Sequence, residues 1–89
     1  MHIHQDKPSN KFLVTVITTL HVFHVEHPLA TKHPLHKGTY DAVRAKNKNG
    51  KMWFLFENGT YGLPEKDLKK AWDNMEVEVT LFGKEVFSN

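Results

Sequence analysis

The chain has 89 residues and a mass of 10.3 kDa, which is room for one small domain whose core supplies modest stability. Hydrophobic residues make up 39% and charged residues 25% of the sequence, which is typical of an ordered globular protein and excludes a disordered one. The absence of cysteine excludes disulfides, thiolate metal sites and cysteine nucleophiles. The net charge of +2 is too small to indicate a polybasic protein.

Residues 1–10 are polar and end in Pro8-Ser9-Asn10, which favours a flexible tail ahead of a single domain covering residues 11–89. Phe12 to Val25 then form a long run rich in Val, Ile, Thr and Phe, and such residues favour a strand over a helix. The length suits a strand that bends near Thr18-Thr19. Because threonine and histidine interrupt the run, we expect no secretory signal and no membrane span, and hence a cytoplasmic protein.

The segment from His27 to Gly38 contains two prolines, which bar it from a central strand and predict a loop. Loops of about twelve residues in compact domains are usually functional or mobile. Two apolar residues of this loop, Leu29 and Leu35, are therefore candidate contacts for a partner.

Two Asn-Gly dipeptides, Asn49-Gly50 and Asn58-Gly59, flank a run of apolar and aromatic residues. Asn-Gly between apolar runs indicates a β-hairpin with a two-residue loop, because both central residues of a type I′ turn have positive φ. The two turns predict a three-stranded meander from Tyr40 to Pro64, with residues 51–57 as its middle strand.

Two-residue loops fix the register of this meander, pairing Lys46 with Trp53 and Leu55 with Gly62. Since neighbouring side chains along a strand point to opposite faces, the register sorts the meander into two surfaces. The predicted core face is Val43, Ala45, Met52, Phe54, Phe56, Tyr61 and Leu63. The predicted basic face is Arg44, Lys46, Lys48 and Lys51 around Trp53 and Leu55.

Pro64 to Asp73 predicts a short helix, because Pro64 suits a first helical position and the acids of the first turn suit the positive end of the dipole. Its apolar stripe is Leu68, Ala71, Trp72 and Met75. The next residues, from Met75 to Phe82, alternate between apolar and polar side chains and predict a half-buried strand.

These elements predict a mainly β (α+β) fold, namely a small five-stranded, barrel-like antiparallel sheet with one short helix before the last strand. The layout resembles the small barrels of the Src-homology type. This resemblance is confined to the order of the elements, and no family motif accompanies it, so it implies nothing about function.

The predicted basic face indicates nucleic-acid binding as one function. Cationic side chains can contact phosphates while the indole of Trp53 stacks on a base, as in proteins that bind single strands. The alternative interpretation is that a lysine-rich hairpin keeps the sheet edge soluble.

All seven histidines lie at or before His36, which raises a metal-binding hypothesis. The spacing of His21, His24 and His27 would suit one side of a helix, but a strand points His24 away from the other two. The sequence therefore predicts no metal site and no cofactor, and solvated strand histidines or a pH-sensitive interface are the alternatives. A histidine-based metal-binding protein is kept as a lesser alternative, which would require His33 or His36 to fold back from the loop.

No nucleophile in the sequence has an evident base and orienting group, and no glycine-rich phosphate loop is present, so we expect a protein that is not an enzyme. A protein-binding module is the first interpretation, with modulation or inhibition of a host protein by a viral or bacterial chain as its setting. Its candidate surface combines Leu29 and Leu35 with Trp53 and the basic face. A second copy of the chain is a further candidate partner, because the edges of so small a sheet need cover.

Overall fold

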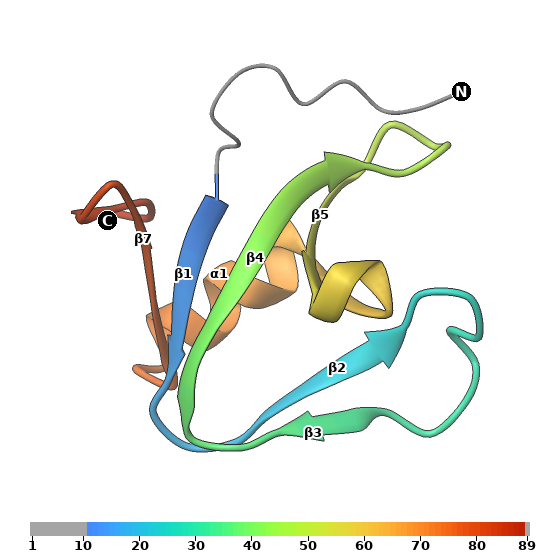
Figure 1. Cartoon of the computed structure of the whole chain (residues 1–89), viewed down its shortest axis with the longest axis horizontal. Coiled ribbons are helices and arrows are strands. Elements are labelled where there is room, and N and C mark those ends of the chain that lie inside the picture. The colour runs from blue at the N-terminus through green and yellow to red at the C-terminus, as the bar shows by residue number, and fades with distance from the viewer. Residues whose placement is uncertain (1–10, 89) are drawn as a thin grey trace.

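The computed structural model describes residues 11–88 and shows a mainly β fold in which one short helix packs against an antiparallel sheet (Figure 1). The predicted tail, residues 1–10, lies outside the described residues. In chain order the elements are β1 (Lys11–Val16), β2 (Leu20–His24), β3 (His33–Leu35), β4 (Gly38–Lys46), β5 (Met52–Phe56), the 3-10 turn η1 (Glu57–Gly59), β6 (Tyr61–Pro64), α1 (Glu65–Asp73), β7 (Val77–Leu81) and β8 (Lys84–Glu85).

The eight strands form one sheet in the order β3-β2-β6-β5-β4-β1-β7-β8. The predicted mainly β class, with one short helix, is confirmed. The sheet is open, with β3 and β8 at its two ends, so the five-stranded barrel-like arrangement is not what the structure has. The three extra strands come from the division of the first apolar run into two and from the short strands β3 and β8.

The first apolar run is interrupted at residues 17–19, at the predicted bend. The two halves have different neighbours, because β1 lies between β4 and β7 whereas β2 lies between β3 and β6. The break thus lets one continuous run contribute to two separate parts of the sheet.

Strand β3 lies inside the segment that was predicted to be a loop, so that prediction is wrong for residues 33–35. Pro34 pairs opposite His21 in β2. Proline has no N–H to donate to a neighbouring strand. Because β3 is the end strand of the sheet, it has a neighbour on one side only, and a missing donor on its other side costs no hydrogen bond.

The first hairpin differs from its predicted register by one residue. Ala45 pairs with Trp53, and the Asn47 N–H donates to the carbonyl of Lys51 at 2.8 Å, which leaves the three-residue loop 48–50. The side chain of Asn47 explains the difference, because its Oδ1 accepts from the N–H groups of Asn49 and Lys51, both at 2.9 Å. The predicted core face is therefore wrong on β4, where Ala42 is buried and Val43 is exposed.

The second hairpin has the predicted register, with Leu55 opposite Gly62. Its loop residues Asn58 and Gly59 have φ of 59° and 91°, as a type I′ turn requires. Of the core residues predicted on β5 and β6, Phe54, Phe56 and Leu63 are buried, Tyr61 is half-buried against the core, and Met52 is half-buried at the start of β5.

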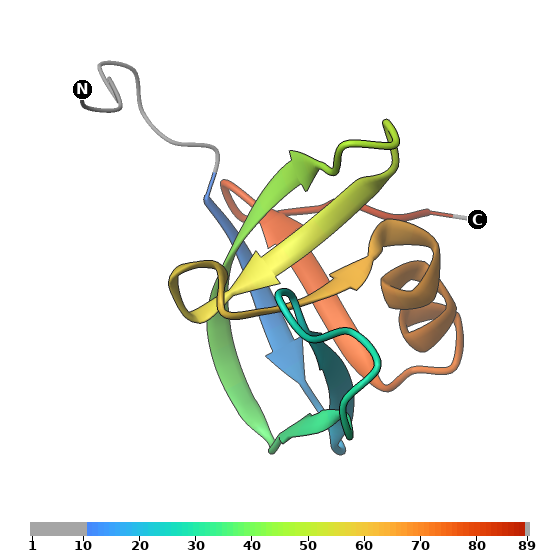
Figure 2. The same ribbon diagram turned by 90° about the vertical axis from the view of Figure 1, so that its right-hand side faces the viewer.

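Helix α1 begins at Glu65, directly after Pro64, and buries Leu68 and Ala71 against the core. Figure 2 shows it on one side of the molecule, across from the η1 turn. Met75 was predicted to extend its apolar stripe, but this residue lies beyond the end of the helix with φ of 63° and is 80% exposed. In β7, Val77 and Val79 are buried and Glu78 is exposed, as the alternation predicts.

The buried apolar side chains form one core between the sheet and α1. None of the helices in residues 11–88 is both long and apolar enough to cross a membrane. The core residues are Phe12, Val14, Val16, Leu20, Val22, Leu35, Ala42, Phe54, Phe56, Leu63, Leu68, Ala71, Val77, Val79 and Phe87.

Candidate binding surface

The side of the sheet that faces away from the core carries apolar side chains on its central strands. We call this surface the outer face, and its residues are Leu13, Val43, Ala45, Trp53 and Leu55. Leu13 is 43% and Val43 is 49% exposed. Since the solvent side of an antiparallel sheet is normally polar, these exposed apolar side chains make the outer face a candidate binding surface.

Gly62 shapes one side of this surface. A Cβ at Gly62 would lie 2.8 Å from Leu55 Cδ2 and 2.9 Å from the carbonyl oxygen of Phe54. It would also lie 3.3 Å from Cε3 of Trp53. The absence of a side chain at this position therefore lets Leu55 and Trp53 lie across β6.

Trp53 is held in this position from the far side by Phe23 of β2. The two ring centroids are 5.9 Å apart, and Lys32 places its Nζ 4.6 Å from the Phe23 ring centroid. Such a cation above an aromatic face is attracted by the ring quadrupole. Trp53 is consequently a half-buried, fixed part of the outer face.

Two hollows lie on the outer face. The larger, of about 870 Å³, has Val43 and Leu55 in its lining together with two carboxylates, Asp41 and Glu57. We call it the acidic hollow. Lys11 also lines it and places its Nζ 3.7 Å from Oδ2 of Asp41.

The second hollow is a groove of about 430 Å³ beside Trp53. Leu55 lines both hollows, so the two adjoin along β5. The groove is lined by Val25, Pro28, Ala45, Lys46, Asn47, Lys48, Trp53 and Leu55. Lysines therefore border one end of the outer face and carboxylates the other.

Glu57, in the wall of the acidic hollow, has φ of 50°. A residue other than glycine in this left-handed region costs on the order of 1–3 kcal/mol and persists only where its surroundings demand it. Asn58, the next residue, also has positive φ, so the strain at Glu57 belongs to the turn that leads from β5 to β6.

The structure divides the predicted basic face. Because the register is shifted, Arg44 lies opposite Phe54 rather than Leu55, and its Nε donates to Glu65 Oε1 of α1 at 2.8 Å. Its charge is thus directed to the helix rather than to the side of Trp53. Lys46 and Lys48 do line the groove beside Trp53, and Lys51 is exposed where the hairpin loop meets β5.

The two leucines of the predicted loop differ in their exposure to solvent. Leu29 is fully exposed, whereas Leu35 is 2% exposed and belongs to the core. Leu29 is available to a partner and Leu35 is not directly accessible. Val43 was predicted to lie on the core face, and Leu13, Asp41 and Glu57 were not predicted as binding residues. The meeting of these four residues on one surface depends on strand adjacency and on the register of the first hairpin.

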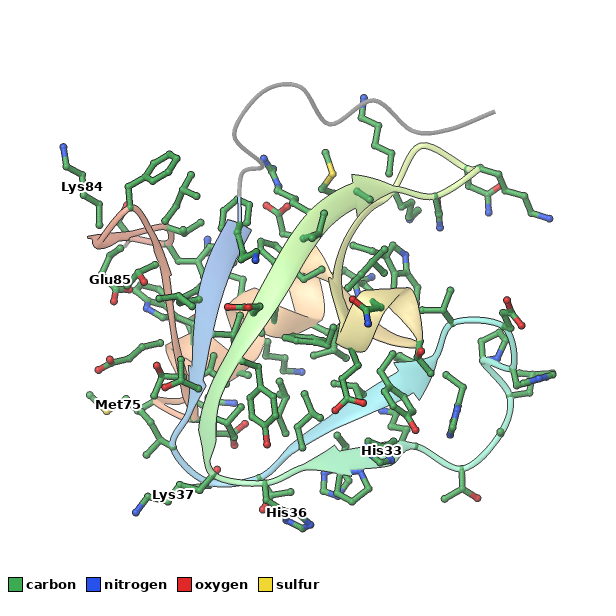
Figure 3. All side chains as sticks on the ribbon, viewed as in Figure 1. His33, His36, Lys37, Met75, Lys84 and Glu85 are labelled. Atoms are coloured by element: carbon green, nitrogen blue, oxygen red, sulfur yellow. The ribbon has the colours of Figure 1, made fainter. Side chains whose placement is uncertain are left out.

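One histidine of β2, His24, and one of β3, His33, lie against the ring of Tyr61. The His33 ring stacks on Tyr61 with centroids 4.0 Å apart and planes at 13°, and His24 approaches the same ring at 4.9 Å. His36 extends away from the body beyond β3 (Figure 3). Within residues 11–88, no group of three or more His, Cys, Asp or Glu side chains is placed to hold a metal ion.

Apolar side chains are also exposed on the opposite flank of the sheet. Met75, Lys84 and Glu85 lie along this flank beside β7 (Figure 3). The carboxylate of Glu85 accepts from Trp72 Nε1 at 3.2 Å. Met75 lies in a turn and lines a separate hollow with Ile17 and Trp72, away from the outer face, so this flank offers a position for comparison with the outer face.

No family model matches the chain, and comparisons with curated proteins and with solved structures found no match.

Proposed function

We propose that this protein is a non-enzymatic protein-binding module that docks a partner protein on its outer face. The observation that carries the proposal is the exposure of Leu13 and Val43 on the neighbouring strands β1 and β4. Val43 lies opposite Leu55 on this face, and Leu13 lies beyond the Lys11–Asp41 ion pair. Covering these three side chains would remove apolar surface from water, the main favourable term in protein association.

The charges around the outer face support a protein partner over a nucleic acid. A nucleic-acid surface needs positive charge throughout, because the phosphates it must contact are all negative. Here two carboxylates, Asp41 and Glu57, line the acidic hollow, and the charge of Arg44 is directed toward Glu65. A mixed border around an apolar centre is the usual composition of a protein interface.

The test compares retention of host proteins by the wild type with retention by two single variants, after nuclease treatment. Val43→Lys places a charge in the outer face at a position that is 49% exposed, so the new ammonium group can stay in water. Met75→Lys introduces the same charge on the opposite flank. We expect Val43→Lys to abolish retention of the partner and Met75→Lys to preserve it. Equal retention by the two variants would contradict the proposal.

Nucleic-acid binding remains the second candidate because Lys46 and Lys48 line the groove beside Trp53. A single strand in this groove would place phosphates near the lysines and a base near the indole. In a Trp72→Phe background, the remaining Trp53 fluorescence should then be quenched by oligonucleotide and should recover with added salt. An unchanged spectrum at low salt would eliminate this candidate.

The proposed setting is the cytoplasm, on the basis of the cysteine-free composition.

A further inference from the structure

The β4–β5 hairpin ends in a lysine-rich tip, which we define as Lys46, Lys48 and Lys51. All three side chains are exposed, and within residues 11–88 none of them forms an ion pair. No acidic residue occurs between positions 42 and 56. The tip projects from the body of the molecule, and it lies at the opposite end of β5 from the η1 turn (Figures 1 and 2).

The acidic hollow lies beside that η1 turn, so the outer face has a polarity along β4 and β5. Its basic end is the lysine-rich tip, its middle is apolar, and its acidic end carries Asp41 and Glu57. A surface with this order of charges is complementary to a copy of itself turned by 180°. Such a two-fold arrangement makes every contact twice, as in most homodimers.

We propose that the outer face binds a second copy of this chain, with the lysine-rich tip of each copy seated against the acidic hollow of the other. This proposal rests on the proposed function, because it uses the same surface.

The spacing along β4 fits this arrangement. Asp41 and Asn47 are separated by roughly 20 Å at about 3.3 Å per residue, which places the two-fold axis roughly halfway, between Val43 and Ala45. The small Ala45 side chain near the axis permits close approach of the two sheets. Val43 and Leu55 of the two copies would then meet in the centre of the interface.

The size of the outer face predicts a weak dimer. The nine-residue β4 is about 30 Å long, whereas β1 and β5 are about 20 Å and about 17 Å long, so three strands about 4.8 Å apart cover roughly 320 Å² per copy, or roughly 650 Å² in total. This area is at the low end for specific interfaces, where transient complexes are found. Lys11 already lies close to Asp41, so the incoming lysines compete with it for that carboxylate. We therefore expect dissociation in the micromolar range, weakened further by salt.

Sedimentation of the purified full chain over a range of concentrations tests this proposal. At low salt the wild type should pass from monomer to dimer. A Lys46→Glu, Lys48→Glu variant has two acidic ends, and an Asp41→Lys, Glu57→Lys variant has two basic ends. Each variant alone should dimerise at least about tenfold more weakly, because like charges face each other.

An equimolar mixture of the two charge-reversed variants should restore dimers, since each acidic end then meets a basic end. A Lys66→Glu, Lys69→Glu variant makes the same charge change on exposed positions of α1 and should dimerise like the wild type. If circular dichroism shows that the Asp41→Lys, Glu57→Lys chain does not fold, the Asp41→Asn, Glu57→Gln chain replaces it. This neutral variant should dimerise more weakly than the wild type. Mixing it with the Lys46→Glu, Lys48→Glu variant should not restore dimers.

A chain that stays monomeric to about 1 mM overturns the dimer, since an interface weaker than this falls below specific association. A dimer that is insensitive to both charge reversals overturns it as well. Neither result affects the proposed function, because a monomer can still retain a different protein in a manner that depends on Val43. Loss of both the dimer and the Val43-dependent retention would reject the two proposals together.

Discussion

The two hairpins that share β5 contain the same Asn-Gly dipeptide but turn in different ways. Asn58 and Gly59 are the two central residues of a turn that the Thr60 N–H closes onto the carbonyl of Glu57 at 3.2 Å, and both have positive φ, as Glu57 does. In the first hairpin only Gly50 has positive φ, at 81°, and the loop is one residue longer. The residue before the loop makes the difference, because Asn47 accepts two backbone N–H groups through its side chain.

This comparison shows that a turn dipeptide predicts the presence of a hairpin better than its register. One extra loop residue exchanges the two faces of β4, turning Ala42 inward and Val43 outward. The outer face exists in its present form because of that exchange. Asn47 therefore affects the candidate binding surface without belonging to its apolar centre.

The largest expected effect concerns the strand pair of the second hairpin. Gly62→Ala should lower the free energy of unfolding by about 1–3 kcal/mol, because the new Cβ would lie too close to the backbone oxygen of Phe54 and to Leu55. Urea denaturation measures this cost. In a Leu55→Ala background the cost should fall but persist, since the backbone oxygen cannot move aside; a neutral Gly62→Ala would show that β6 is not packed as described.

The next effect contrasts the two asparagines of the Asn-Gly pairs. Asn58→Ala should cost about 1 kcal/mol, since alanine tolerates a φ of 59° less well than asparagine. Asn49→Ala should cost much less, because Asn49 has negative φ and contributes only its backbone N–H. Thermal unfolding of the matched pair is the measurement, and equal costs would remove the distinction between the turns.

A comparable or slightly smaller effect is expected at Asn47. Asn47→Ala removes the acceptor of two hydrogen bonds and should cost about 1 kcal/mol. Amide hydrogen exchange at Asn49 and Lys51 should accelerate in this variant. Asn47→Asp keeps the acceptor and serves as the control, with exchange close to that of the wild type; acceleration in both variants would contradict the role of the side-chain oxygen.

The smallest effect reports on the register itself. Arg44 and Glu65 form an exposed ion pair at 2.8 Å, so a double-mutant cycle with alanine should give a coupling of about 0.2–1 kcal/mol that decreases with salt. The predicted two-residue loop would instead direct Arg44 to the face of Trp53. A coupling of zero to Glu65 would favour that register.

Local sequence patterns correctly predicted those helices and strands whose conformation does not depend on contacts with distant parts of the chain. The alternation around Val77 and Val79 identified β7, and the acidic first turn beginning at Glu65 identified α1. The prediction that Met75 extends the apolar stripe of the helix was wrong, because helical periodicity does not show that the helix has already ended before this residue, which has positive φ. Pro34 was taken as a sign of a loop, although a strand at the end of a sheet tolerates it.

The candidate binding surface was harder to predict, because its composition depends on which strands are neighbours and on the register in which they pair. Trp53 and the lysines near it were identified, since their chemistry is visible in the sequence. The apolar centre was missed: Leu13 reaches it through the pairing of β1 with β4, and Val43 through the shifted register. Neither the pairing of β1 with β4 nor the shifted register can be predicted from the few residues on either side of Leu13 or Val43.

The placement of β1 between β4 and β7 has a consequence for the order of folding. One side of β1 can pair as soon as β4 is present, whereas the other must wait for β7, much farther along the chain. Native pairings between distant segments are slow to form because a long loop must first close. During synthesis on the ribosome, β1 therefore presents an unsatisfied edge until β7 emerges, and this interval is when the chain is most exposed to misassembly.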